Sequence, residues 1–390
     1  MQIDKRATLL VFILLAALDT VSCKQAQQNA NAAKPKMGRW VAQYRSPELV
    51  KYSGVNMAEI FYSSISVVSP SVVFVAGDMP NPKQGGERIG IVVRTSDGGQ
   101  SWIETPIEQQ GFHVTTINSI HFINPSEGWA VGANLTDEGA LIEPYLLKTA
   151  DGGATWAVSK LNLKQVPTTV FFSDSSKGWM GGATPPLGEE EGAGGPSAIL
   201  GTTDGGLTWQ PQNNVPVSIF DLSFLDDMNG WACGTKGAIY HTSDGGRTWN
   251  SQRSELEPGE GPVNLTSEGL KQFRMLGIHF TDAQNGFAAA ASEEESIGYL
   301  VATTNGGTSW ARKWKVGDSG VSDMFFLNAN EGWALTDRGQ YIYHTIDGTR
   351  SWLSEPKIFE QDVTLVRLGA ADAAHVWAVG GGAIFYRVME

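Results

Sequence analysis

The chain has 390 residues, of which 41% are hydrophobic and 18% charged, a composition typical of a folded globular protein. Its formal net charge of −13 argues against nucleic acid as a partner, because phosphates require a basic surface. It has only two cysteines, Cys23 and Cys233, so no disulfide framework holds the fold.

The N-terminus resembles an export signal. Lys5 and Arg6 provide a positive start, and the apolar run from Leu9 to Leu18 is too short to span a bilayer as a helix. The run leads to Ser22-Cys23, which resembles the lipobox of bacterial lipoproteins. We therefore expect an exported, periplasmic or cell-envelope protein that is lipid-anchored at Cys23, with ordinary signal-peptide cleavage as the alternative.

The domain organisation follows from this start. Residues 1–23 are the expected signal peptide, and residues 24–37, rich in Ala, Asn and Gln, predict a flexible tether. Residues 38–390 are expected to form the folded domain, which we expect to be a monomer.

An eight-residue motif, Thr-x-Asp-Gly-Gly-x-Ser/Thr-Trp, recurs six times in the folded part; it is the Asp-box, or bacterial neuraminidase repeat. The Asp carboxylate can accept hydrogen bonds from its own turn, and the glycines allow the positive φ of a tight hairpin. Asn305 replaces Asp in one copy, and Thr349 replaces the second Gly in another, which predicts a strained or altered turn there. The expected structural pairs are Asp97 and Trp102, Asp151 and Trp156, Asp204 and Trp209, Asp244 and Trp249, Asn305 and Trp310, and Asp347 and Trp352.

A second motif, Gly-Trp-Ala-x-Gly or a variant of it, alternates with the boxes and recurs seven times, at intervals of 44 to 56 residues. This spacing is typical of a four-stranded propeller blade. The sequence therefore predicts an all-β, seven-bladed β-propeller. The aromatic anchors of the motif are Phe74, Trp129, Trp179, Trp231, Phe287, Trp333 and Trp377.

There are seven anchors but only six boxes. This difference is expected if the two chain ends together form one blade, whose last strand comes from the N-terminus. The C-terminal strand Ala383–Val388 matches the strand before a box, but no box follows it. Residues 38–42, Gly-Arg-Trp-Val-Ala, match a strand that follows a box. Pairing of these strands would close the ring and leave no open sheet edge.

The long insertions all fall between the second and third strands of a blade or between blades. They are therefore expected on the face opposite the boxes, and loops of this kind carry function on a rigid scaffold. They are rich in glutamate, which predicts either a rim that attracts a basic partner segment or simply a solvated surface. The expected partner-face residues are Glu189, Glu190, Glu191, Glu255, Glu257, Glu293, Glu294 and Glu295.

The combination of Gly-Trp-Ala-x-Gly with Thr-x-Asp-Gly-Gly-x-Thr-Trp resembles the photosystem II stability and assembly factor family, from about Trp40 to the C-terminus. The resemblance implies a non-catalytic binding or assembly factor that holds newly made reaction-centre subunits, lipid-anchored in cyanobacteria and thylakoid-lumenal in chloroplasts. That family is associated with an arginine-lined binding surface, whereas this chain is acidic.

The enzyme alternative is a sialidase-like or other propeller glycoside hydrolase, because sialidases also carry Asp-boxes. They need an arginine triad, usually opened by Arg-Ile-Pro, and a Tyr nucleophile with a Glu partner, but here the nearest string is Arg88-Ile89-Gly90. His121 and His279 occupy equivalent repeat positions, which indicates a scaffold role. We therefore expect no catalytic set, no metal site and no cofactor.

Overall fold

Met37–Glu390 form one compact unit. The computed structural model describes residues 38–45, 60–81, 83, 87–136, 139–183, 197–215, 217–252, 256–257, 273–292, 298–316, 320–336, 340–358 and 363–389. Every regular element within these ranges is a β-strand. Among the described residues, no helix has the length and hydrophobicity needed to cross a membrane.

The strands form seven sheets, which we number as blades in chain order. Blade 1 is β2 (Phe61–Val67), β3 (Val73–Pro80), β4 (Arg88–Thr95) and β5 (Ile103–Pro106); blade 2 is β6 (Thr116–Phe122), β7 (Gly128–Leu135), β8 (Leu141–Thr149) and β9 (Ala157–Lys160); blade 3 is β10 (Val166–Phe172), β11 (Gly178–Ala183), β12 (Ser197–Thr202) and β13 (Gln210–Val215); and blade 4 is β14 (Ile219–Phe224), β15 (Gly230–Gly234), β16 (Ile239–Thr242) and β17 (Asn250–Ser251).

Blades 5 and 7 take in additional segments, whereas blade 6 consists of four consecutive strands. Blade 5 is β19 (Phe273–Phe280), β20 (Gly286–Ser292), β21 (Gly298–Thr303) and β22 (Trp310–Val316), edged by β18 (Leu256–Glu257); blade 6 is β23 (Val321–Phe326), β24 (Gly332–Thr336), β25 (Tyr341–Thr345) and β26 (Leu353–Glu355); and blade 7 is β28 (Leu365–Asp372), β29 (His375–Gly380), β30 (Ala383–Met389) and β1 (Gly38–Arg45), edged by β27 (Lys357–Ile358).

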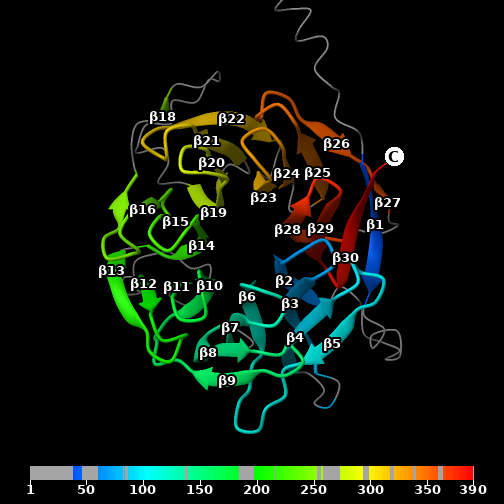
Figure 1. Cartoon of the computed structure of the whole chain (residues 1–390), viewed down its shortest axis with the longest axis vertical. Helices are drawn as coiled ribbons and strands as arrows, with labels where there is room; N and C mark the ends of the chain where they lie inside the picture. Colours follow the sequence, from blue (N-terminus) through cyan, green and yellow to red (C-terminus); the bar gives the residue numbers. More distant parts are fainter. Residues whose placement is uncertain are drawn as a thin grey trace, which may run out of the picture. The chain divides into compact units, whose positions relative to one another are not determined.

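The seven sheets stand around a central opening, with the first strand of each blade innermost (Figure 1). The predicted seven-bladed β-propeller is therefore confirmed. Consecutive blades pack through their faces because each strand alternates its side chains between the two neighbouring blades.

Ring closure by the chain ends is also confirmed. β1 pairs antiparallel with β30, from Gly38 opposite Met389 to Arg45 opposite Ala383. Gln43 of β1 also connects blade 7 to blade 1, because its Nε2 donates a hydrogen bond to the carbonyl of Gly98 in the blade 1 box at 2.8 Å. The indole of Trp377 donates to Oε1 of the same Gln43 at 3.0 Å. Sheet pairing thus completes blade 7, and the bond from Gln43 to Gly98 joins blade 7 to blade 1.

One aromatic unit repeats around the core. Phe172, at the end of β10, stacks on Trp129 of the preceding blade with ring centroids 3.9 Å apart, and the box residue Trp209 meets it edge-on at 84°. Gly178 must lack a side chain, because a Cβ there would lie 2.6 Å from the Phe172 ring. The same arrangement is built on Phe122, Phe224, Phe280 and Phe326.

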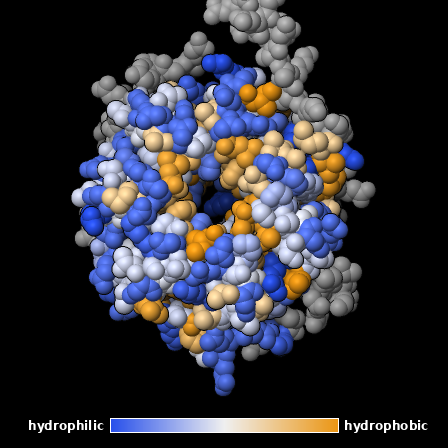
Figure 2. Space-filling view, in the orientation of Figure 1, coloured by the Kyte–Doolittle hydropathy of each residue, from blue (hydrophilic) through white to orange (hydrophobic). Residues whose placement is uncertain are grey.

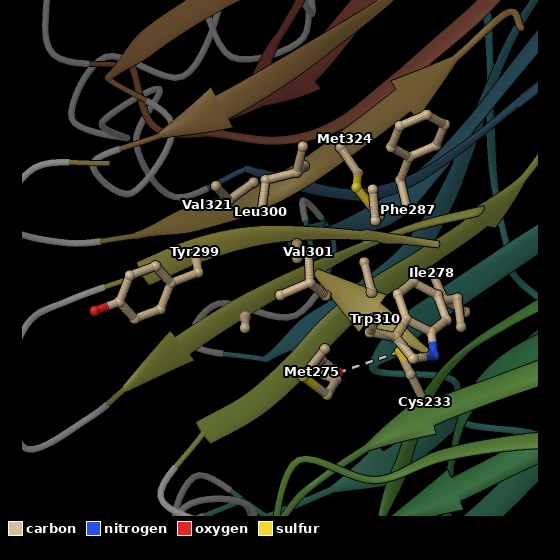
Figure 3. Close-up of a cluster of buried hydrophobic side chains, with 14 of the residues drawn as sticks. Cys233, Met275, Ile278, Phe287, Tyr299, Leu300, Val301, Trp310, Val321 and Met324 are labelled. Carbon is tan, nitrogen blue, oxygen red and sulfur yellow. Dashed lines mark hydrogen bonds between the residues drawn. The ribbon is translucent and has the colours of Figure 1, made fainter. Parts of the chain in front are cut away.

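The largest core cluster lies between blades 4, 5 and 6 (Figure 3). Cys233 is completely buried in it, and its thiol donates to the carbonyl of Met275 at 3.3 Å. Burial raises the pKa of this thiol well above its usual value. Cys233 is therefore a small core residue.

Candidate functional site

The six box turns lie at one face of the ring, because each joins the third strand of a blade to the fourth. In blade 3, Oδ1 of Asp204 accepts hydrogen bonds from the Thr202 hydroxyl and the Thr208 N–H at 2.8 and 2.9 Å, and Oδ2 accepts one from the Thr208 hydroxyl at 2.6 Å. These bonds, first that from the Thr208 hydroxyl, lower the pKa of Asp204 to about 2. The carboxylate is thus committed to its own turn.

The two irregular boxes keep most of this geometry. The Asn305 amide oxygen accepts from the Thr303 hydroxyl and the Ser309 N–H, so an amide replaces the carboxylate. Thr349 has a φ of 75°, a strained value for a β-branched residue, and its buried hydroxyl has no hydrogen-bond partner. The strain predicted at this position is present.

Three tryptophans of the second motif connect neighbouring blades on the box side. The indole N–H of Trp129 donates to the carbonyl of Gly205 in the next box at 3.1 Å. Trp179 and Trp231 donate in the same way to Gly245 and Gly306. The box face is therefore occupied by bonds within and between blades.

Most of the residues expected to bind a lipid or a partner fall outside the described part of the chain. This applies to Cys23 and to Glu189, Glu190, Glu191, Glu255, Glu293, Glu294 and Glu295. Glu257 is described only as a backbone position of β18, which pairs with β22.

A cavity of about 430 Å³ opens at the face opposite the boxes, where the innermost strands begin. Two arginines, Arg274 and Arg367, contribute to its lining. The surface view shows apolar side chains gathered around the opening at the centre of the face in view (Figure 2). The apolar lining of the cavity consists of Phe61, Val166, Phe220, Leu276 and Val366.

A second cavity of about 370 Å³ continues along the central channel and shares four lining residues with the first: Asn118, Thr168, Phe220 and Arg367. Each innermost strand has a β-bulge there, and the residue after the bulge lines the channel or adjoins it. In chain order these seven residues are Ser64, Ser119, Thr169, Asp221, Gly277, Asp323 and Arg367.

Of the two aspartates of this series, Asp323 is buried and Asp221 is partly buried. Burial raises the pKa of Asp323 to about 7 and also raises that of Asp221, although the guanidinium of Arg367 opposes both shifts. Arg367 Nη1 lies 4.0 Å from Asp323 Oδ1. Sequence reasoning missed this group, although aligning blades 2 to 6 at the phenylalanine three residues further on would have shown Asp, Gly and Asp where blades 2 and 3 have Ser and Thr.

The described residues also contain a Tyr–Glu pair of the type that a sialidase needs. The Tyr145 hydroxyl donates to Glu143 at 2.6 Å, and Glu143 is held by Lys160. Tyr145 is fully buried, and burial together with this carboxylate raises its pKa to about 12. A nucleophile requires the opposite shift, so the pair is suited to structure rather than to attack.

Fold and repeats together define a seven-bladed β-propeller built on Asp-boxes. A model of the family described as "Photosynthesis system II assembly factor YCF48" matches residues 211–312, which confirms the expected family resemblance across blades 4 and 5. No curated protein matches the chain.

Solved structures show the same fold over most of the chain. "YCF48 bound to D1 peptide" has a TM-score of 0.62 at 17% identity and covers 90% of this chain and 96% of its own. YCF48 from Cyanidioschyzon merolae has a TM-score of 0.61 at 17% identity, covering 90% and 98%. The GH74 xyloglucanase from Xanthomonas campestris has a TM-score of 0.53 at 12% identity, covering 82% and 50%.

Proposed function

We propose that this protein is a non-catalytic assembly factor that holds a segment of a membrane protein, with a photosystem reaction-centre subunit as the first candidate. The match to the assembly-factor family model over residues 211–312 carries this proposal. It is supported by a solved YCF48 structure that contains a D1 peptide. The glycoside hydrolase alternative is supported by fold likeness alone, at 12% identity.

The partner segment would bind at the channel mouth, the part of the insertion face lined by Phe61, Val166, Phe220, Leu276 and Val366. Phe61 is 41% exposed there, so its aromatic face is open to a partner. The box face is less suitable, because its Asp and Trp side chains are used within the fold. An apolar pocket at the mouth of the channel fits an extended segment with one or two large side chains.

The glutamate-rich insertions would then steer the approach of a segment that carries positive charge. Steering by exposed charges acts mainly on the association rate and weakens with salt. Replacing Glu189, Glu190 and Glu191 with glutamine should therefore slow association more than it speeds dissociation.

Capture from native membranes tests the function. The full chain with a photoactivatable crosslinker at the channel mouth should recover a membrane protein, identified by mass spectrometry. Phe61→Ala should lose this capture, while Leu207→Ala should keep it, because Leu207 is an exposed apolar side chain on the box face. Equal capture by both variants, or release of sugar from a glycoside panel, would contradict the proposal.

We further propose that the protein is exported and anchored at Cys23. Labelling of cells with an alkyne fatty acid should mark the wild-type protein and leave Cys23→Ala unmarked. Equal labelling of both proteins would rule out the anchor without affecting the binding proposal.

A further inference from the structure

The residue after the inner-strand bulge has one structural role that the repeat itself reveals. In blades 1 and 2, the hydroxyls of Ser64 and Ser119 accept the N–H of Ile120 and Val170 in the next blade, at 3.1 and 3.2 Å. In blades 4 and 6, Asp221 and Asp323 accept the equivalent N–H groups of Ile278 and Leu368 at 2.9 and 2.7 Å. Because serine makes this bond as well, the connection between blades does not require a carboxylate.

The position of the two carboxylates lowers the stability of the fold when they are ionised. Asp323 is only 7% exposed, and an ionised group taken out of water destabilises the fold unless it is paired. Among the described residues, one guanidinium, that of Arg367, serves both aspartates. The group therefore carries one negative charge in excess when both are ionised.

Gly277, in the blade between them, leaves a space that both carboxylates face. A Cβ at Gly277 would lie 3.5 Å from Oδ1 of Asp323 and 3.7 Å from Oδ2 of Asp221, both ordinary contacts. The φ of Gly277 is not in the positive range that favours glycine, and an added Cβ would make only ordinary contacts. Neither the backbone conformation nor the packing therefore requires glycine at this position. Three consecutive departures from the repeat thus create a small space with carboxylate oxygens on two sides.

The charge and the approach to this space specify its ligand. One excess negative charge beside a guanidinium suits a single monovalent cation, and no group of three potential metal ligands occurs among the described residues. Entry from the insertion face passes the apolar side chains of Phe61, Phe220 and Leu276. An apolar stem that ends in a positive charge is the chemistry of lysine.

We infer that the channel binds an alkylammonium group between Asp221 and Asp323, supplied by a lysine side chain of the partner segment. This inference rests on the proposed function for the source of the lysine, but the ammonium site itself is testable alone. Binding pairs the ammonium with the ionised carboxylates. The proton that Asp323 holds near neutral pH then passes to the solvent.

Titration calorimetry of the full chain with n-butylammonium, which has the length of a lysine side chain, tests the site. In buffers of different ionisation enthalpy, binding should release protons at pH 7, more at pH 6 and fewer at pH 8. Tetramethylammonium, which has no N–H to donate, should bind much more weakly. No proton release and no change in the Asp323 carboxyl carbon shift with excess n-butylammonium would overturn the inference.

Variants separate this site from general effects of burial. Asp323→Asn should abolish proton release and weaken butylammonium binding by about tenfold or more, since it removes a charge-assisted bond. Gly277→Ala should fold, because the added Cβ makes only ordinary contacts, yet weaken binding by filling the space. Asp78→Asn is the matched control: Asp78 is another buried aspartate with a raised pKa, it pairs with Arg88, and it lines neither cavity. Equal binding in all three variants would contradict the site.

A synthetic peptide with the sequence of the captured partner segment tests whether a lysine of that segment supplies the ammonium group. Acetylation of its lysines should weaken binding to the wild type and have no further effect on Asp323→Asn. If acetylated and unmodified peptides bind equally, the lysine source is wrong. If no segment is ever captured but butylammonium binds as described, the ammonium site stands and the proposed function fails.

Discussion

Arg387 and Glu355 form a fully buried ion pair between blade 7 and blade 6, beside the strands in which the chain ends meet. Arg387 Nη2 lies 2.6 Å from Glu355 Oε1, and each residue is no more than 2% exposed. The same carboxylate accepts the backbone N–H of Gly38 at 3.1 Å and the indole N–H of Trp40 at 2.9 Å. One side chain of blade 6 therefore holds both strands, β30 and β1, with which the chain ends meet in blade 7.

Glu355→Gln should destabilise the protein by about 3 kcal/mol, because it leaves the buried guanidinium of Arg387 without a counter-ion. Chemical denaturation at pH 7 measures this change. Glu108→Gln is the control, since Glu108 forms an exposed ion pair with Lys83 and its loss should cost less than about 1 kcal/mol. Equal effects of the two substitutions would show that the buried pair of Glu355 and Arg387 contributes no more to stability than an exposed ion pair.

The contribution of Glu355 should depend on pH in a defined window. Burial alone would raise its pKa, but hydrogen bonds from His344 and Arg387 outweigh burial and hold the pKa at about 2. A depressed pKa gives stability that is present above the unfolded value of 4.5 and is lost as the pH falls towards 2. The stability difference between wild type and Glu355→Gln should therefore shrink from pH 5 to pH 2, and a constant difference would contradict this.

Deletion of residues 37–44 should lower the melting temperature and promote association. It removes most of β1, which exposes the edge of β30 and takes away the Gln43 bonds to Gly98 and Trp377. Thermal melting and light scattering measure the two effects. An unchanged melting temperature would show that the ring does not depend on closure by the N-terminal strand.

Asp204→Ala should lower the melting temperature, whereas Asp204→Asn should change it much less. The asparagine in the blade 5 box already makes the equivalent bonds to Thr303 and Ser309. Neither variant should alter capture of a partner, because the boxes lie away from the channel mouth. Loss of capture by folded Asp204→Asn would place the partner on the box face instead.

Thr349→Gly should stabilise the protein by about 1 kcal/mol. Thr349 has a φ of 75°, which glycine adopts without steric cost, and the change also removes a buried hydroxyl that lacks a partner. Denaturant unfolding measures the gain. Destabilisation would mean that the threonine methyl group contributes packing worth more than the strain.

The sequence by itself determined the fold, because each blade repeats the same local chemistry. The box at Asp204 and the glycine before Trp179 each fix one turn or one close contact, and their period sets the number of blades. The count of seven anchors against six boxes even predicted the pairing of β1 with β30. Local rules of this kind can be read without coordinates.

Only the tertiary structure brought Asp221, Gly277, Asp323 and Arg367 together. They lie on four different blades and are 44 to 146 residues apart in the chain, so no local pattern links them. Nor did the sequence reveal that Glu355 would meet Arg387, because that contact requires the closed ring. The interactions between charged groups depend on their distance in space and on their burial, and both are set by how the blades surround the channel.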